Sequence, residues 1–136
     1  MADMVKDQPT SRQEIENLLG IVERDCSQSA FQGIHLDIRY ELLYNAALQL
    51  ATIVLRLSDL RIGRIGHHRE TFQVVRKLVP EGLRPTVLHF DQARRKRNSL
   101  VYDQAGTATE ADLEGLEISV NAFKKWVNKL IDSHCT

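Results

Sequence analysis

Arginines and polar side chains that suit phosphate binding crowd one segment, Arg94-Arg95-Lys96-Arg97-Asn98-Ser99-Leu100-Val101-Tyr102-Asp103. A guanidinium presents a planar fork of N–H donors that matches the oxygens of a phosphate group. The apolar stripe that begins at Val87 and Phe90 continues, at helical spacing, into Arg94 and Arg97. We therefore expect these two arginines, with Arg95, to line a cleft. The alternative is a basic helix end whose aliphatic stems are buried while the charged groups reach water.

The residues that follow Arg97 add hydrogen-bonding groups to the same region. Asn98 and Tyr102 lie four residues apart, so a helix places the amide and the phenol on one face. Arg97 and Tyr102 lie five residues apart, about 140° around the helix, and would flank a ligand instead of touching each other. We expect Asn98, Tyr102 and Asp103 to support Arg97 in binding that ligand.

A pair of histidines follows a glycine at Gly66-His67-His68 and forms a second candidate site. Adjacent residues on a helix point about 100° apart, so the two imidazoles do not suit one metal ion, and we expect no metal site. The first turn of a helix carries free backbone N–H groups that bind anions. His67 or His68, together with Arg64 and Arg69, is therefore a candidate phosphate site. Capping or packing at the turn is the alternative.

Length and composition define the class of protein in which these residues lie. The chain has 136 residues, 43% of them hydrophobic and 26% charged, which is typical of one globular domain. A domain of this size needs neither a disulfide nor a metal to fold. We expect Cys26 and Cys135 to be free thiols of a reducing compartment. The first ten residues show no signal peptide, and the apolar stretch from Leu42 to Leu57 contains polar residues, so a cytoplasmic protein without a membrane span is expected.

Charge is unevenly distributed along the chain, although its formal total is zero. Between Arg56 and Arg97 there are eleven Lys and Arg residues against four Asp and Glu residues. This basic middle suits a surface that faces a polyanion. It equally suits pairing with acidic helices of the same chain or of a partner subunit.

Helical periodicity dominates the chain, and no segment alternates with the period of two that marks a strand. After a poorly ordered tail at residues 1–9, five helices are expected: from Thr10 or Ser11 to Cys26, from an Asp37 cap to Leu60, from His67 to Val79, from Pro85 to Asp103, and a last helix that a Thr107–Glu110 capping box begins. The second is apolar almost all round, which places it at the centre. Short loops between long helices predict an all-α, up-down antiparallel bundle of four main helices plus one short helix, in a single domain.

The segment from Arg97 to Asp103, set late in a helical bundle and followed by a loop and a long final helix, resembles the signature of the HEPN domains. In that family an Arg, often followed by a polar residue such as Asn, precedes a His a few residues later. The resemblance covers nearly the whole chain and implies a HEPN-like fold. Many members are metal-independent ribonucleases whose Arg and His lie at a homodimer interface. Others are non-catalytic partners of nucleotidyltransferases.

Tyr102 stands where the catalytic His of the family would be. If the chain is active, the resemblance implies that Arg97 and Tyr102 are its catalytic residues. A phenol has an ordinary pKa of about 10, against about 6.5 for imidazole, so it is poorly suited to proton transfer at neutral pH, although it can donate a hydrogen bond to phosphate. The presence of Tyr102 in place of the family's His therefore favours binding of a phosphate over cleavage of RNA. A histidine at the start of the third helix would replace the missing one if that helix start folds against the fourth helix.

The sequence thus predicts a HEPN-like, homodimeric module without a cofactor, which binds a nucleotide or RNA phosphate through Arg97 or binds a partner protein such as a nucleotidyltransferase. One alternative is a structural protein with no nucleic-acid role, which docks a partner subunit. Its arginines would then pair with the acidic residues that begin the last helix, Glu110, Asp112, Glu114 and Glu117. A lesser alternative is an active metal-independent ribonuclease. Sequence-specific duplex binding is disfavoured by the net neutrality of the chain.

Overall fold

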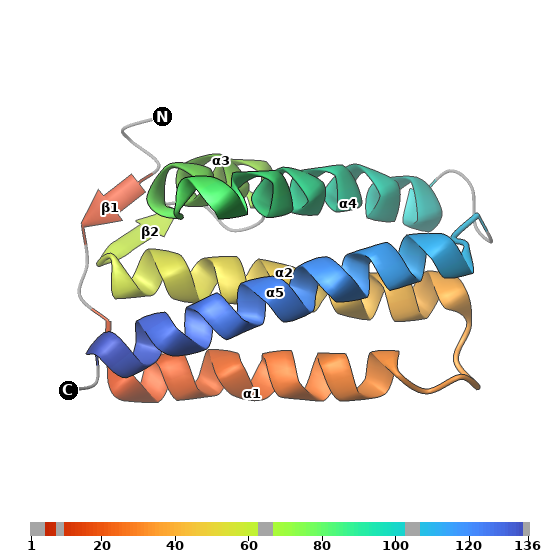
Figure 1. Ribbon diagram of the computed structural model, residues 1–136, viewed down its shortest axis with the longest axis horizontal. Coiled ribbons are helices and arrows are strands. Elements are labelled where there is room, and N and C mark those ends of the chain that lie inside the picture. Colours follow the sequence, from red (N-terminus) through yellow and green to blue (C-terminus); the bar gives the residue numbers. More distant parts are fainter. Residues whose placement is uncertain (1–4, 8–9, 63–66, 103–106, 135–136) are drawn as a thin grey trace.

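The computed structural model describes residues 5–7, 10–62, 67–102 and 107–134 (Figure 1). Its helices are α1 (Arg12–Ser29), α2 (Leu36–Leu57), α3 (His68–Leu78), α4 (Arg84–Tyr102) and α5 (Glu110–His134), and a 3₁₀ turn (Glu81–Leu83) precedes α4. The protein is therefore all-α, as its periodicity predicts, apart from one small antiparallel ladder. Among the described helices none combines the length and the apolar character that crossing a membrane requires.

The ladder joins β1 (Val5–Asp7) to β2 (Leu60–Ile62) and corrects two expectations. The chain does contain strands, and residues 1–9 are more than a tail, because part of them forms β1. Each strand has three residues, which is too short for a period-two pattern to be recognised in the sequence. Figure 1 shows the ladder at one end of the molecule, beyond the end of α2.

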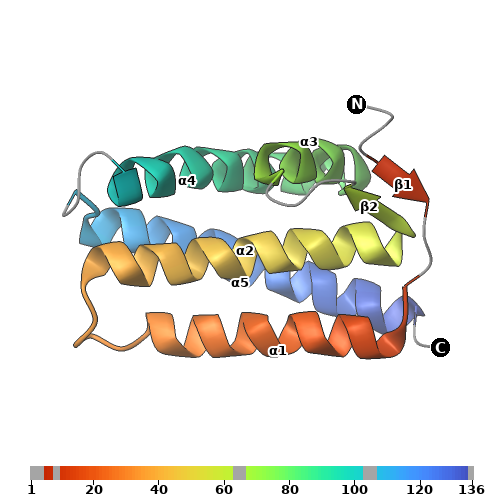
Figure 2. The ribbon, with the colours of Figure 1, turned by 180° about the vertical axis from the view of Figure 1, so that it is seen from behind.

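α2 lies at the centre of the molecule and packs against α1, α3, α4 and α5 (Figures 1 and 2). Its buried side chains point to all sides, as the sequence predicts: Tyr40, Leu43, Tyr44, Ala46, Ala47, Leu50, Ala51, Ile53, Val54 and Leu55. The helix ends at Leu57 and not at the expected Leu60. Asp59 turns the chain out of the helix with a φ of 58°, a left-handed conformation that Asp tolerates better than most residues.

The first two helices begin with different kinds of cap. Ser11 caps α1 as predicted, and its Oγ accepts a hydrogen bond from the backbone N–H of Glu14 at 3.1 Å. The predicted Asp37 cap of α2 is wrong. His35 is the cap, and its Nδ1 accepts from the Asp37 N–H at 3.1 Å. Asp37 instead accepts from the backbone N–H of Ala108 at 3.1 Å, which ties the start of α2 to the segment before α5.

A capping box begins α5, two residues later than the one expected. Thr109 Oγ1 accepts from the Asp112 N–H at 3.0 Å, and Asp112 Oδ2 accepts from the Thr109 N–H at 3.0 Å. These two residues replace the predicted pair Thr107 and Glu110, because an Asp at the third helical position reaches back as a Glu does. The buried face of α5 agrees with the sequence pattern: Leu113, Leu116, Val120, Phe123 and Val127.

A row of aromatic rings joins α2, α3, α4 and α5 through the core. The ring centroid of Phe90 lies 6.1 Å from that of Phe72 and 5.3 Å from that of Phe123. The Phe72 ring lies 6.1 Å from Tyr44. Aromatic pairs at this spacing contribute more than their buried area alone. The row holds the first half of α3 against α4 and so brings the histidines toward the arginines.

α4 has a buried stripe that runs past the arginines. Val87, Phe90, Ala93 and Leu100 are all at most 6% exposed. The side chains of Arg94 and Arg97 keep 19% and 26% of their exposure and lie at the edge of this stripe. Most of each side chain is covered, and part of it stays accessible to solvent, which combines features of both interpretations offered by the sequence.

Candidate anion-binding site

The start of α3 and the second half of α4 enclose a hollow of about 230 Å³. Three residues of α3 and three of α4 line it: His68, Arg69, Glu70, Arg94, Arg97 and Asn98. The fold therefore brings His68 to the residues that the sequence places in a cleft on the fourth helix. We call this site the Arg97 hollow.

Arg97 is held at the hollow by a carboxylate and an amide. Its Nη2 lies 3.3 Å from Oε1 of Glu41 on α2, and its Nη1 donates to Oδ1 of Asn98 at 3.2 Å. Its Nε is buried and finds no hydrogen-bond partner in the described part of the chain. A buried N–H group without an acceptor costs about 1–3 kcal/mol. An acceptor oxygen supplied by a ligand would remove that cost once the side chains that cover Nε move aside.

Arg94 and Arg95 share one carboxylate, that of Asp91. Arg94 Nε lies 2.9 Å from Oδ1 and Arg95 Nη2 lies 3.3 Å from Oδ2. Two guanidinium groups on one carboxylate leave a surplus of positive charge. The Arg94 side chain is 19% exposed and lines the Arg97 hollow, whereas Arg95 is 69% exposed and lines a neighbouring hollow.

His68 is anchored to α2 through a buried phenol. Its Nδ1 lies 2.9 Å from the hydroxyl of Tyr44, a residue that is 2% exposed. Burial strongly raises the pKa of Tyr44, so the phenol keeps its proton at neutral pH. Burial, and then the positive charges of Arg97 and Arg94, lower the pKa of His68, so the imidazole is neutral.

The direction of the Tyr44–His68 hydrogen bond determines what His68 offers to a ligand. The hydroxyl of Tyr44 has one partner among the described residues, and its proton would lack an acceptor if His68 were the donor. Tyr44 therefore donates to Nδ1, and the proton of the neutral imidazole resides on Nε2. In this tautomer Nε2 of His68 is a hydrogen-bond donor, and the lone pair of Nδ1 is occupied by Tyr44.

Of the remaining predicted residues, one is placed by the structure, and the side chains of the others lie outside its described part. His67 is the cap residue of α3, where its carbonyl oxygen accepts from the Thr71 N–H at 3.1 Å and its Nδ1 lies 3.1 Å from Glu70 Oε2. It does not line the Arg97 hollow. Arg64 and Asp103 lie outside the described residues. Tyr102 ends α4, but its side chain also lies outside the described part.

Three contributors to the site are missed by sequence reasoning: Glu41, Tyr44 and Asp91. Glu41 and Tyr44 lie on α2, whose nearly continuous apolar pattern indicates only a core helix. The sequence signal that could have identified Glu41 is its carboxylate within an otherwise apolar helix. A charged residue on a central helix needs a partner of opposite charge. Asp91 lies three residues before Arg94 and four before Arg95 on α4, spacings at which side chains of a helix meet.

The acidic residues at the start of α5 form an ion pair with a lysine and not with the arginines of α4. Lys96 Nζ lies 3.3 Å from Asp112 Oδ2 and donates to the carbonyl oxygen of Thr107 at 3.3 Å. The described ion pairs of Arg94, Arg95 and Arg97 go to Asp91 and Glu41 instead. The pairing of these arginines with the last helix, as the structural alternative supposes, is thus not found among the described residues.

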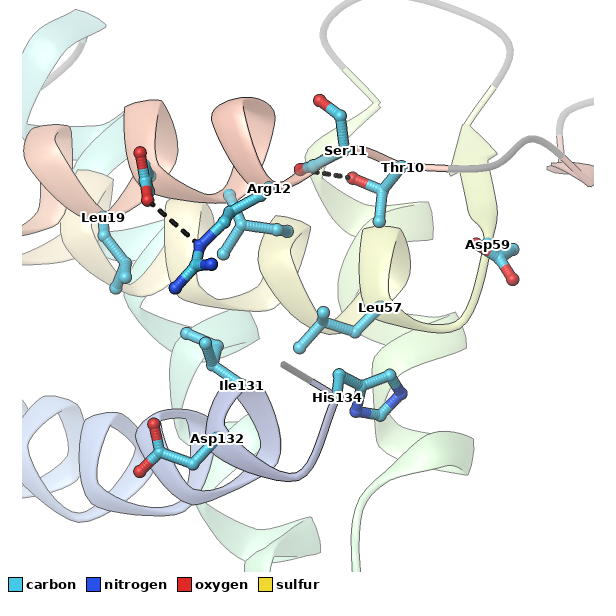
Figure 3. A pocket seen from close by; sticks show the side chains of 11 residues that line it. Thr10, Ser11, Arg12, Leu19, Leu57, Asp59, Ile131, Asp132 and His134 are labelled. Carbon is cyan, nitrogen blue, oxygen red and sulfur yellow. Dashed lines mark hydrogen bonds and ion pairs between the residues drawn. The ribbon is translucent and has the colours of Figure 1, made fainter. Parts of the chain in front are cut away.

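Another hollow, of about 490 Å³, lies among the N-terminal part of α1 and the C-terminal parts of α2 and α5 (Figure 3). Leu19, Leu57 and Ile131 give it an apolar wall, and Asp132 and His134 lie at its edge. Its Arg12 is already paired with Glu16 at 3.4 Å. None of the residues predicted to bind a ligand lines it, so we do not assign it a function.

Fold and site together define an all-α protein with half-buried arginines and a neutral histidine at a helix–helix junction. In the described ranges, no group of three or more His, Cys, Asp or Glu side chains is placed to hold a metal ion. Cys26 is a free thiol whose pKa is raised by burial, and Cys135 lies outside those ranges. Comparisons with protein-family models, curated proteins and solved structures find no match to the chain. The geometry of the Arg97 hollow is thus the basis for assigning a function.

Proposed function

We propose that this protein is a HEPN-like helical module that binds the phosphate group of a nucleotide or of RNA in the Arg97 hollow. The observation that carries the proposal is the half-buried Arg97, whose Nε lacks an acceptor while Arg94, Asn98 and His68 line the same hollow. Guanidinium groups bind phosphate oxygens through paired, charge-assisted N–H donors. A bound phosphate would satisfy the Arg97 Nε–H and neutralise the surplus positive charge.

Binding without cleavage is the activity that the site supports best. A metal-independent ribonuclease needs a base that takes the proton of the attacking hydroxyl. The Tyr44 hydroxyl lies 2.9 Å from Nδ1 of His68, and by donating there it occupies the lone pair of the neutral imidazole, which leaves Nε2–H as a donor. Arg97 would still stabilise phosphate charge, but Glu70, the carboxylate among the residues lining the hollow, already lies 3.1 Å from Nδ1 of His67 and is not free to take the proton of an attacking hydroxyl.

The resemblance to HEPN domains also carries the proposed assembly. We propose that the chain acts as a homodimer or as the partner of a nucleotidyltransferase-type protein, in a four-helix, up-down arrangement of the HEPN kind. The antiparallel packing of long helices around α2 supports this part of the proposal.

The rival function is a structural one, and one observation favours it. Arg97 already faces Glu41, and Arg94 already faces Asp91, so both arginines have partners within the chain. If these pairs serve only the fold, replacing Arg97 lowers stability. If Arg97 serves a ligand, the same replacement lowers affinity and leaves stability nearly unchanged, because the carboxylate of Glu41 is 43% exposed and remains solvated.

The test compares Arg97→Gln with a matched charge control, Lys129→Gln, on the exposed side of α5. Isothermal titration with adenosine monophosphate measures affinity, and thermal melting of the same samples measures stability. A charge-assisted hydrogen bond contributes about 1.5–3 kcal/mol, so Arg97→Gln is expected to weaken binding about tenfold or more. Lys129→Gln should bind like the wild type.

The two functions give opposite results in this experiment. A large loss of affinity with an unchanged melting temperature supports phosphate binding. An unchanged affinity, or absence of any phosphate-dependent heat in the wild type, refutes it. A large fall in the melting temperature of Arg97→Gln alone supports the structural function.

A further inference from the structure

Two more hollows lie along the junction of α3 and α4. The first, of about 190 Å³, includes Arg69, Arg76 and Arg95 in its lining, and the second, of about 540 Å³, includes Arg76, Lys77 and Arg84. Arg69 also lines the Arg97 hollow, and Arg76 lines both of the others. Because neighbouring hollows share these residues, the three form one row along the junction of the two helices. We call it the α3–α4 groove.

The α3–α4 groove is strongly basic in a chain whose net charge is zero. Seven Lys and Arg side chains line its three hollows, against the two carboxylates of Glu70 and Asp91. Like charges gathered along one groove repel one another in the free protein. Such a surface attracts a polyanion and speeds its association.

Four of these cations have no partner that explains their position. Arg69, Arg76, Lys77 and Arg84 are all exposed and form no ion pair within residues 10–62, 67–102 and 107–134. Arg69 lines the Arg97 hollow, and Arg76, Lys77 and Arg84 lie beyond it along the two helices. Arg94 and Arg97 are held by carboxylates, whereas these four side chains present their charge to a ligand.

The dimensions of the groove indicate what kind of polyanion fits. From Arg84 to Arg97 the rise of α4 is about 20 Å at 1.5 Å per residue. At about 3.4 Å per nucleotide of a stacked strand, this length spans about six phosphates. A strand that follows this junction places its one backbone in the groove, whereas the second backbone of a duplex would lie outside it and gain no contact there.

The lining of the groove also limits how a strand would be recognised. Phe72 is the aromatic residue of its middle hollow, and it is 2% exposed, so it offers no face on which a base can stack. Phosphate contacts alone carry no sequence information. A strand bound here would be held by its backbone.

We propose that the α3–α4 groove binds the sugar–phosphate backbone of a single-stranded nucleic acid, with one phosphate in the Arg97 hollow and the following ones along Arg69, Arg76, Lys77 and Arg84. This inference rests on the proposed function of the Arg97 hollow. It extends that function from one phosphate to a strand of about six nucleotides, bound without preference for base sequence and equally as RNA or DNA.

The experiment measures fluorescence anisotropy of labelled oligouridylates and oligothymidylates of two to twelve nucleotides with the full chain. The test variant is Arg76→Gln/Arg84→Gln, and the matched control is Lys125→Gln/Lys129→Gln on α5; all four positions are exposed. Affinity should rise with length up to about six nucleotides and then level off. Two lost phosphate contacts should reduce the salt slope of binding by about 1.4, and at 0.1 M salt weaken binding about tenfold or more.

Adenosine monophosphate separates the failure of this proposal from the failure of the proposed function. The Arg76→Gln/Arg84→Gln variant should bind the mononucleotide as the wild type does, because it leaves the Arg97 hollow intact. If adenosine monophosphate binds in an Arg97-dependent way but longer strands bind no more tightly, the groove proposal is overturned and the proposed function stands. A duplex that binds as tightly as the single strand, or equal losses in test and control variants, also overturns the groove proposal. Absence of mononucleotide binding refutes the proposed function itself.

Discussion

Glu41 competes with a phosphate for Arg97, and replacing Glu41 by Gln is expected to tighten phosphate binding. The carboxylate lies 3.3 Å from Arg97 Nη2 and occupies one of the donors that a ligand would use. Glu41→Gln keeps the shape of the side chain and an oxygen that can accept a hydrogen bond. It removes the negative charge, which both holds the guanidinium and repels an incoming anion.

The size of the effect follows from the exposure of the pair. Glu41 is 43% exposed and Arg97 is 26% exposed, so solvent screens their attraction to about 0.2–1 kcal/mol. Repulsion between the carboxylate and a phosphate about 6 Å away adds about 0.7 kcal/mol per unit charge in water before salt screening. The two contributions act in the same direction, and together they correspond to about four- to sixteenfold tighter binding before salt screening.

The assay is titration with adenosine monophosphate at low salt, with Glu23→Gln as the control. Glu23 forms an ion pair with Lys124 at 2.6 Å, is 61% exposed and lies on α1, so its replacement changes the net charge equally. The Glu23→Gln affinity should equal that of the wild type. Weaker binding by Glu41→Gln, or the same gain in both variants, would refute the assignment of Arg97 as the phosphate ligand.

Two further outcomes are expected. Burial, and then Arg97 and Arg94, lower the pKa of His68 in the folded protein. The unfolded chain therefore binds a proton at His68 more readily than the folded protein does. The stability that the neutral imidazole contributes is complete above the unfolded pKa of about 6.5 and is lost as the pH falls through the folded pKa. Urea unfolding at pH 7.5 and 5.5 should therefore show a smaller loss of stability on acidification for His68→Gln than for the wild type, and parallel losses would contradict the assigned burial. Ser11→Ala removes the acceptor for the Glu14 N–H and should cost about 1 kcal/mol of unfolding free energy; an unchanged urea midpoint would show that Ser11 does not cap α1.

The helices are predictable because their signals are local. The all-round apolar pattern of α2 and the three- and four-residue spacing from Leu113 to Val127 indicate buried faces without knowledge of their neighbours. The caps are less predictable because several residues compete at each start. The caps are formed by His35 and Thr109 and not by the predicted Asp37 and Thr107. The β1–β2 ladder depends on a pairing between distant segments, which no local sequence pattern indicates.

The site is predictable only in part, for the same reason. The arginine run on α4 identifies Arg94, Arg97 and Asn98 because their types and spacing already suit phosphate. That His68 and not His67 lines the hollow depends on how α3 packs against α4, through Phe72 and Phe90. Tyr44 and Glu41 belong to the site through long-range packing of α2, which the sequence does not reveal.

The most direct test of the central claim is to observe the guanidinium of Arg97 while a phosphate binds. Its Nε–H, buried and without an acceptor among the described residues, should give a nuclear magnetic resonance signal that shifts saturably as adenosine monophosphate is added. The signals of Arg94 Nε–H and of His68 should follow the same binding curve, and that of Arg24 on α1 should not move. An Arg97 signal that stays unchanged while the nucleotide binds, or that shifts no more than the signal of Arg24, would contradict the account.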